Sequence, residues 1–162
     1  VRRRPAHPLT QPYLDGIPSQ VMLNQIVVAG AIVRGCTVLV AQRVRPPELA
    51  GRWELPGGKV AAGETERAAL ARELAEELGL EVADLAVGDR VGDDIALNGT
   101  TTLRAYRVHL LGGEPRARDH RALCWVTAAE LHDVDWVPAD RGWIADLART
   151  LNGSAADVHR RC

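Results

Sequence analysis

The sequence has no phenylalanine, a single methionine and only 4% aromatic residues, so four Trp and two Tyr must supply the large rings of any core. It also has no long apolar run, because the longest, 26–33, is far too short to span a bilayer. An excess of one charge is missing as well, since the formal net charge is -1. No global field therefore attracts a nucleic acid polymer or an anionic membrane, and any phosphate binding must come from a local site.

Cysteine is scarce and scattered along the chain. Cys36, Cys124 and Cys162 are odd in number and lack the spacing of metal ligands. This pattern fits a reducing compartment better than an oxidising one. The basic residues 2–4 are not followed by the apolar segment of a secretory signal. We therefore expect a cytoplasmic protein.

The length of 162 residues suits one compact domain, and 46% apolar with 25% charged residues is the balance of an ordinary globular protein. Residues 1–21 contain three Arg and four Pro but no periodic pattern, so we expect a poorly ordered N-terminal extension there. The domain itself is expected at 22–152, followed by a loose C-terminal tail at 153–162.

The chain after residue 25 mixes strand and helix patterns. The clearest helix is 66–78, with Thr65 as its N-cap and Gly79 as its stop. The other expected elements are strands at 26–33, 36–42, 80–91, 101–111 and 122–126, a short helix from Thr127, and a last helix at 141–151 that ends near Gly153. Because these elements do not form regular βαβ units, we expect an α/β fold in which helices flank a mixed β-sheet.

The helix at 66–78 carries an unusual set of charges. Glu73, Glu76 and Glu77 stand at i, i+3 and i+4, so one helix face projects three carboxylates together. Arg72 lies four residues before Glu76 and can hold it by a charge-assisted hydrogen bond. Three clustered carboxylates repel one another, and a hard cation such as Mg²⁺ relieves that repulsion. Taken alone, the same pattern also describes a solvated, Glu-rich helix face.

A glycine-rich loop directly before this helix favours the metal site. Residues 53–59 read Trp-Glu-Leu-Pro-Gly-Gly-Lys, and Glu64 adds a fourth carboxylate at the helix entrance. Gly57 and Gly58 allow the backbone to approach a metal or a phosphate closely, while Lys59 supplies a positive charge. The loop and the helix together predict a site for a metal-bound phosphate.

Residues 58–80 read Gly-x5-Glu-x7-Arg-Glu-Leu-x-Glu-Glu-x-Gly-Leu, and this pattern resembles the Nudix box at every defining position. A chance match at one site has a frequency on the order of one in a billion at average residue frequencies. The similarity to MutT-like members extends over 22–151. It implies the Nudix-type α/β/α sandwich and a Mg²⁺-dependent hydrolase, with Mn²⁺ as a substitute metal, that cleaves nucleoside triphosphates to monophosphates.

The resemblance also implies roles for individual residues. The implied metal ligands are the Gly57 carbonyl, Glu73, Glu76, Glu77 and Asp119. Glu73 would also orient or deprotonate the attacking water, while Arg72 would orient the carboxylates and Glu64 would support the loop. Arg43 and Lys59 would contact the phosphates. For Asp119 the alternative is an exposed loop acid without a function.

The segment 135–140 bears on the choice of base. Asp140 takes the place of an Asn found in relatives that prefer oxidised guanine, and it resembles the residue of CTP-preferring relatives. An ionised carboxylate only accepts hydrogen bonds, and cytosine offers its N4 amino group as a donor. The alternative is that Asp140 caps the following helix. Trp136, Trp53 and Tyr106 could stack on a base, but each is also a plausible core residue.

These observations predict a pyrophosphohydrolase of CTP and dCTP, including 5-methyl and other 5-substituted cytidines, that acts in nucleotide-pool sanitation. An 8-oxo-dGTP diphosphatase is the alternative within the same class. A non-catalytic nucleotide-binding regulator is the alternative outside it, and the intact box carboxylates argue against it. The expected partner is a small-molecule nucleotide, with no nucleic acid polymer and no membrane, and the chain could be a monomer or a homodimer.

Overall fold

The computed structural model describes residues 24–159, so the extension expected at 1–21 lies outside the described residues. Its strands are β1 (Gln25–Arg34), β2 (Thr37–Gln42), β3 (Trp53–Glu54), β4 (Gly57–Lys59), β5 (Leu85–Asn98), β6 (Thr101–Leu110) and β7 (Ala122–Thr127). Its α-helices are α1 (Glu66–Leu78) and α2 (Ile144–His159), and its 3₁₀ helices are η1 (Val82–Asp84), η2 (Leu131–Asp133) and η3 (Ala139–Trp143). None of these helices is long and apolar enough to cross a membrane.

The strands form one mixed sheet, as expected. Its main order is β3-β2-β1-β6-β5, with β4 also paired to β1 and β7 to β2. The long pairing of β1 with β6 is parallel, whereas β1 with β2, β1 with β4 and β5 with β6 are antiparallel. Strand β1 therefore lies at the centre of the sheet, which explains why its sequence is almost continuously apolar.

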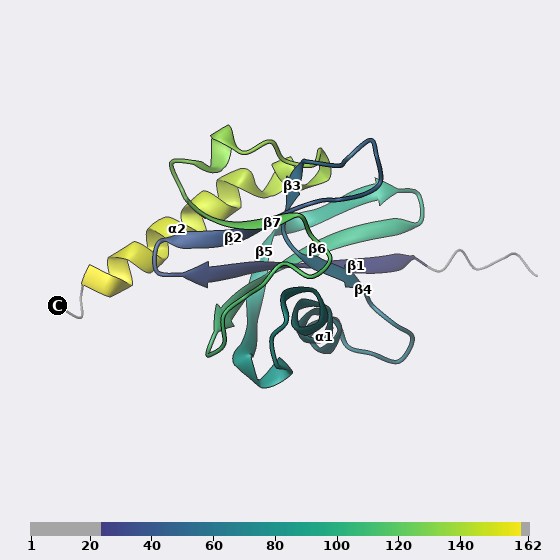
Figure 1. Cartoon of the computed structure of the whole chain (residues 1–162), viewed down its shortest axis with the longest axis horizontal. Coiled ribbons are helices and arrows are strands. Elements are labelled where there is room, and N and C mark those ends of the chain that lie inside the picture. Colours follow the sequence, from purple (N-terminus) through teal and green to yellow (C-terminus); the bar gives the residue numbers. More distant parts are fainter. Residues whose placement is uncertain (1–23, 160–162) are drawn as a thin grey trace, which may run out of the picture.

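Helices α1 and α2 cover opposite faces of the sheet (Figure 1). On the α1 side, Val28 and Ile32 of β1 belong to one buried cluster with the apolar stripe of the helix, which consists of Leu70, Leu74 and Leu78. On the α2 side, Ala29 and Ala31 belong to a second cluster together with Trp143, Leu147 and Leu151. The alternation of β1 residues between the two clusters is that of a strand buried on both faces. The expected α/β/α sandwich is confirmed.

Helix α1 has the predicted bounds because the residues that start and stop it act on their own neighbours in the chain. Thr65 accepts a hydrogen bond from the backbone N–H of Ala68 at 3.2 Å, which caps the first turn. Gly79 has φ 66° and donates its backbone N–H to the Ala75 carbonyl. Such a left-handed C-terminal residue is easiest for glycine.

Other boundaries differ from the predictions. The strand expected at 80–91 begins only at Leu85, because Glu81 and Asp84 close the 3₁₀ turn η1 by reciprocal side-chain bonds. The helix expected from Thr127 is a turn in which the Glu130 carboxylate accepts the Thr127 backbone N–H at 2.8 Å, followed by η2. The last helix does not end near Gly153 but continues to His159, so most of the segment expected as a loose tail is helical.

Gly30 of β1 packs directly against Leu74 of α1. A Cβ atom at Gly30 would lie 2.9 Å from Cδ1 of Leu74, and Leu74 is fully buried. We expect Leu74→Ala to lower the free energy of unfolding by about 3 kcal/mol, because it leaves a cavity in the α1-side cluster. Gly30→Ala should destabilise the wild type but cost much less in the Leu74→Ala background, where the new methyl group fills vacated space. Chemical denaturation of both single variants and the double variant measures this coupling, and simple additivity would contradict the packing.

Candidate active site

Two glycines let strand β4 run directly between β1 and α1. Gly57 and Gly58 pair with Ala29 and Val28 of β1. A Cβ atom at Gly57 would lie 2.0 Å from the Val28 carbonyl oxygen, and one at Gly58 would lie 2.3 Å from the carboxyl carbon of Glu73. No larger residue fits either position without movement of backbone or carboxylate. The glycines therefore bring the loop backbone against the first box carboxylate.

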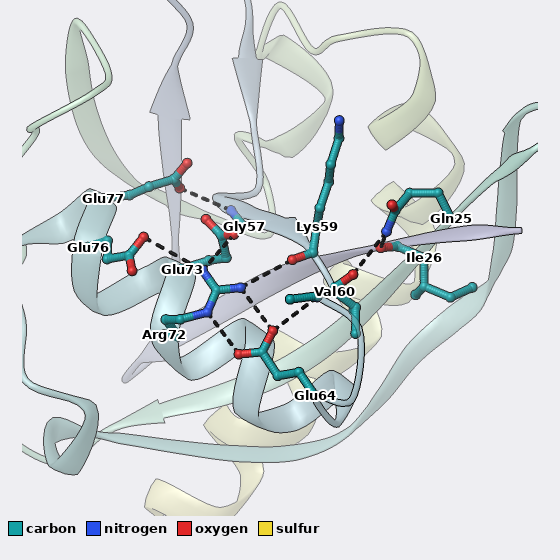
Figure 2. A network of polar contacts seen from close by, with 11 residues as sticks. Gln25, Ile26, Gly57, Lys59, Val60, Glu64, Arg72, Glu73, Glu76 and Glu77 are labelled. Carbon is teal, nitrogen blue, oxygen red and sulfur yellow. Dashed lines mark hydrogen bonds and ion pairs between the residues drawn. The ribbon is translucent and has the colours of Figure 1, made fainter. Parts of the chain in front are cut away.

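Figure 2 shows Arg72 at the centre of a network of polar contacts. Its guanidinium donates to both Glu64 oxygens at 2.8 and 3.0 Å, to Glu73 at 3.0 Å and to the Lys59 carbonyl at 3.3 Å. The Arg72 guanidinium lies 3.7 Å from a Glu76 oxygen, which is an ion pair and not the charge-assisted hydrogen bond expected from the helix spacing. The hydrogen bond from Arg72 is the main reason that the pKa of Glu64 lies below its ordinary value. Arg72 and Glu64 thus tie the loop to the helix face, as expected of a supporting pair.

The three helix carboxylates do not point the same way. Glu73 lies against Gly58, and Glu77 accepts the Gly57 backbone N–H at 3.2 Å (Figure 2). The Glu76 side chain is 61% exposed and contacts Arg72 instead. Within residues 24–159, no three His, Cys, Asp or Glu side chains are grouped closely enough to hold a metal ion as they stand. The expected cluster is therefore a pair of carboxylates at the loop with a third outside it.

Glu77 is the helix carboxylate in the most unfavourable environment. Its pKa is raised to about 7, mainly by burial and also by the nearby negative charges of Glu54 and Glu73, against the opposing effects of His120 and the Gly57 N–H. A divalent cation beside Glu73 and Glu77 would remove this repulsion. Carboxylate and carbonyl oxygens are also the ligands that Mg²⁺ prefers. The residues at the loop therefore fit a hard divalent cation.

A cavity of about 660 Å³ opens next to this loop. Six of the predicted site residues line it: Arg43, Gly57, Lys59, Glu77, Asp119 and Asp140. Asp119 is exposed to solvent at its edge, and Lys59 is likewise exposed. Expected phosphate-contact, metal-ligand and base-contact residues are thus represented in one space, although these six are spread over nearly 100 residues of chain. Arg72, Glu73 and Glu76 do not line it.

Sequence reasoning did not single out Glu54 and His120, which also line this cavity. Glu54 accepts a hydrogen bond from the Arg43 guanidinium on one oxygen, and its other oxygen lies 3.0 Å from Nε2 of His120. The His120 side chain is only 6% exposed, and its buried Nδ1 has no hydrogen-bond partner among the described residues. The available signals were their neighbours, since Glu54 lies in the glycine-rich loop and His120 directly follows Asp119.

Asp140 is the only charged residue that is buried within the described part of the chain, at 3% exposure. Its Oδ2 accepts the backbone N–H of Leu55 at 2.8 Å. Burial raises its pKa to about 7, while the Leu55 N–H acts in the opposite direction. The capping alternative is wrong, because Asp140 lies inside η3, whose N-cap position is Pro138 and which has no side-chain cap bond. Asp140 instead joins the start of η3 to the loop that precedes Gly57.

The two rings expected to contact the base lie elsewhere. Trp136 is 1% exposed in the α2-side cluster and donates its indole N–H to the Leu131 carbonyl at 2.7 Å. Tyr106 packs in the α1-side cluster, and its hydroxyl donates to Glu66. Neither lines the cavity. In a chain without phenylalanine these rings fill the core, which removes both from the base-contact residues expected above.

Comparisons with known proteins agree with this architecture. The NUDIX domain family model matches residues 24–147. The chain is 40% identical to the CTP pyrophosphohydrolase of Escherichia coli (strain K12) over 116 residues, which are 70% of this chain and 84% of that protein. It is 27% identical to the 8-oxo-dGTP diphosphatase of the same organism over 129 residues, or 78% and 99% of the two chains.

Among solved structures, the solution structure of the E. coli ORF135 protein superposes with a TM-score of 0.67 at 32% identity, covering 85% of this chain and 96% of that one. The family match spans more than half of the chain and includes the loop, helix α1 and the start of α2. The position of the glycine loop against α1, the Arg72 network and these matches lead to the same conclusion. The chain belongs to the Nudix family and is a Nudix hydrolase.

Proposed function

We propose that this enzyme is a divalent-metal-dependent pyrophosphohydrolase of CTP and dCTP that releases the monophosphate and pyrophosphate. One observation carries the proposal: a single cavity is lined both by the glycine loop with Glu77 and by the buried carboxyl group of Asp140. The first part suits phosphates, and the second suits the hydrogen-bonding edge of a base. The similarity to a CTP pyrophosphohydrolase over 70% of the chain supports the same substrate class.

The phosphate side of the site would hold Mg²⁺, or Mn²⁺ in its place, through Glu73, Glu77 and the Gly57 carbonyl, with Glu76 and Asp119 as further ligands. A bound cation of this kind clamps phosphate oxygens and acidifies water. Glu73 orients the attacking water, and Arg72 holds Glu73 in place at 3.0 Å. Arg43, held by Glu54, and Lys59 neutralise phosphate charge at the cavity wall.

The base side depends on Asp140. Its Oδ2 is occupied by the Leu55 N–H, which leaves Oδ1 to accept from the N4 amino group of cytosine. In its neutral form the same carboxyl group also donates to N3, and a pKa of about 7 makes that form accessible near neutral pH. The volume of about 660 Å³ leaves room for 5-substituted cytidines, which extends the proposed role to nucleotide-pool sanitation.

The first test is pyrophosphate release with Mg²⁺ or Mn²⁺ from CTP, dCTP, 5-methyl-dCTP, dGTP and 8-oxo-dGTP. We expect the cytidine nucleotides to give the highest kcat/KM, and chelation of the metal to abolish turnover. Glu77→Gln should lower kcat/KM by about a hundredfold or more, because it removes a charged metal ligand. Glu114→Gln is the matched control, since that side chain is 66% exposed and pairs only with Arg34 at 3.2 Å among the contacts described.

Each alternative has its own outcome in this assay. Turnover dominated by 8-oxo-dGTP would keep the hydrolase and overturn the cytidine assignment. Binding of nucleotide without any pyrophosphate would favour a regulatory protein over an enzyme. Equal activity of the Glu77→Gln and Glu114→Gln variants would contradict the placement of the metal.

Asp140→Asn tests the base assignment. Asn keeps the size of the side chain and can still accept the Leu55 N–H, but its free group cannot offer the same pair of hydrogen bonds as a carboxyl group. We expect the ratio of kcat/KM for CTP to that for 8-oxo-dGTP to fall by about tenfold, the effect of one lost base contact. An unchanged ratio would mean that Asp140 only supports the loop.

The raised pKa of Asp140 also predicts how stability depends on pH. The folded protein keeps this proton up to about pH 7, whereas the unfolded chain loses it near the ordinary value of 3.8. The folded state therefore binds more protons between these values, so the free energy of unfolding falls as the pH rises through them. The Asp140→Asn variant cannot bind this proton. Glu77, whose pKa is also raised, is present in both proteins, so the difference in stability between them reports on Asp140.

We expect the stability of the wild type, measured relative to Asp140→Asn by urea denaturation, to decline from pH 4 to pH 7. A difference that stays constant over this range would show that Asp140 is ionised throughout.

A further inference from the structure

Four large apolar side chains are exposed in the described part of the chain: Val44 at 50%, Val82 at 54%, Leu97 at 47% and Leu111 at 68%. Val44 and Leu97 line the cavity, whereas Val82 and Leu111 do not. Single exposed apolar residues are normal on a surface. Two that line the same cavity are different, because a ligand can cover both.

Leu97 reaches the cavity from the β5–β6 hairpin. It lies two residues after Ile95, at an irregularity in the pairing of β5 with β6 between Ala96 and Asn98, and Ile95 packs against the α2-side cluster. A Cβ atom at Gly142 would lie 2.9 Å from Cδ1 of Ile95, so this part of β5 lies directly beside η3. Helix η3 carries Asp140. Along β5, Ile95 adjoins the helix that carries Asp140, and the large apolar residue that follows Ile95 is Leu97.

Val44 reaches the cavity from the loop that follows β2. The preceding residue, Arg43, is held to Glu54 through its guanidinium and to Arg52 and Gly51 through its backbone. Glu54 directly precedes Leu55, whose N–H bonds Asp140. Figure 1 shows this loop and the β5–β6 turn at the same end of the sheet, and the cavity has both in its wall. Val44 and Leu97 thus approach the Asp140 side of the cavity from two different elements.

No Trp or Tyr of the described residues lines the cavity. A base that meets Asp140 with its edge still has two apolar faces, which bind best when they are covered and removed from water. The exposed apolar side chains available to cover them in this cavity are aliphatic. The other apolar lining residues on this side, such as Leu103 and Val137, are already buried in the protein.

We propose that Val44 and Leu97 form an aliphatic clamp on the faces of the nucleobase, replacing a stacking ring and setting the preference for the base. This inference rests on the proposed function, because it assumes that a nucleoside triphosphate binds with its base beside Asp140. The clamp contributes to binding of the base and not to the chemistry at the phosphates. It therefore affects KM far more than kcat.

The chain offers matched controls for both members of the clamp. Leu97→Ser is compared with Leu111→Ser, and Val44→Ser with Val82→Ser. In each comparison the same type of exposed apolar side chain is removed, once in the cavity and once outside it. Binding of α,β-methylene-CTP with Mg²⁺ is measured by calorimetry, which needs no turnover. Inorganic tripolyphosphate serves as the ligand that keeps the phosphates and lacks the base. Leu97→Thr, which suits a strand, repeats the test if Leu97→Ser melts at a lower temperature than the wild type.

We expect Leu97→Ser and Val44→Ser each to weaken binding of the CTP analogue by about tenfold, from the lost apolar burial, and to leave tripolyphosphate binding unchanged. The two control variants should bind both ligands as the wild type does. Equal affinity for the analogue in all proteins, or a parallel loss of tripolyphosphate binding, would overturn the clamp. Absence of pyrophosphate release from CTP by the wild type would instead count against the proposed hydrolase, so the two failures are distinguishable.

Discussion

The structure of the site depends on one close passage of backbone, in which β4 runs between β1 and α1 at Gly57 and Gly58. Contact at this point is limited on one side by the Val28 carbonyl and on the other by the Glu73 carboxylate. The hydrogen bonds of β4 to β1 hold the loop at the sheet, and the Arg72 contacts hold the helix to the loop. Glu73 and Glu77 of α1 therefore face a backbone whose position is fixed by the centre of the sheet.

The same loop also positions the base side of the cavity. Trp53 and Trp136 form an isolated bridge, with the Trp53 N–H donating to the Asp135 carbonyl at 2.9 Å and the Val137 N–H to the Trp53 carbonyl at 2.8 Å. The Leu55 N–H then bonds Asp140. Residues 53–57 thus bond first to the segment 135–140, through Trp53 and Leu55, and then to β1, through Gly57. A shift of this loop would move the phosphate contacts and the base contact together, which couples recognition to chemistry through ordinary backbone hydrogen bonds.

The sequence predicted the features whose causes are local. Helix α1 was placed correctly because Thr65 and Gly79 act on their own neighbours, and the Arg72 pairs follow from helix spacing and the adjoining loop. The placement of Trp136 and Tyr106 was not predictable, since a ring suits the core and a ligand equally well until the faces of the strands are known. The link between Glu54 and His120 was missed for a related reason, because it joins residues 66 positions apart. Asp140 was singled out from the sequence, but its burial and its bond to Leu55 depend on tertiary structure.

The charges of the cavity explain why the proposed reaction needs a cation that arrives with its substrate. The acidic lining residues are Glu54, Glu77, Asp119 and Asp140, and the basic ones are Arg43, Arg45 and Lys59. One of these bases, Arg43, is already paired with Glu54, so a free triphosphate would meet too little positive charge. A divalent cation at Glu77 would supply it and relieve the repulsion around this half-buried carboxylate. At Asp140 the proposed base contact needs no cation, because a neutral base brings donors and acceptors rather than charge. Burial raises the pKa of both carboxyl groups, but the proposed consequence differs: partial burial at Glu77 favours a metal, and full burial at Asp140 favours a proton and a selective hydrogen bond.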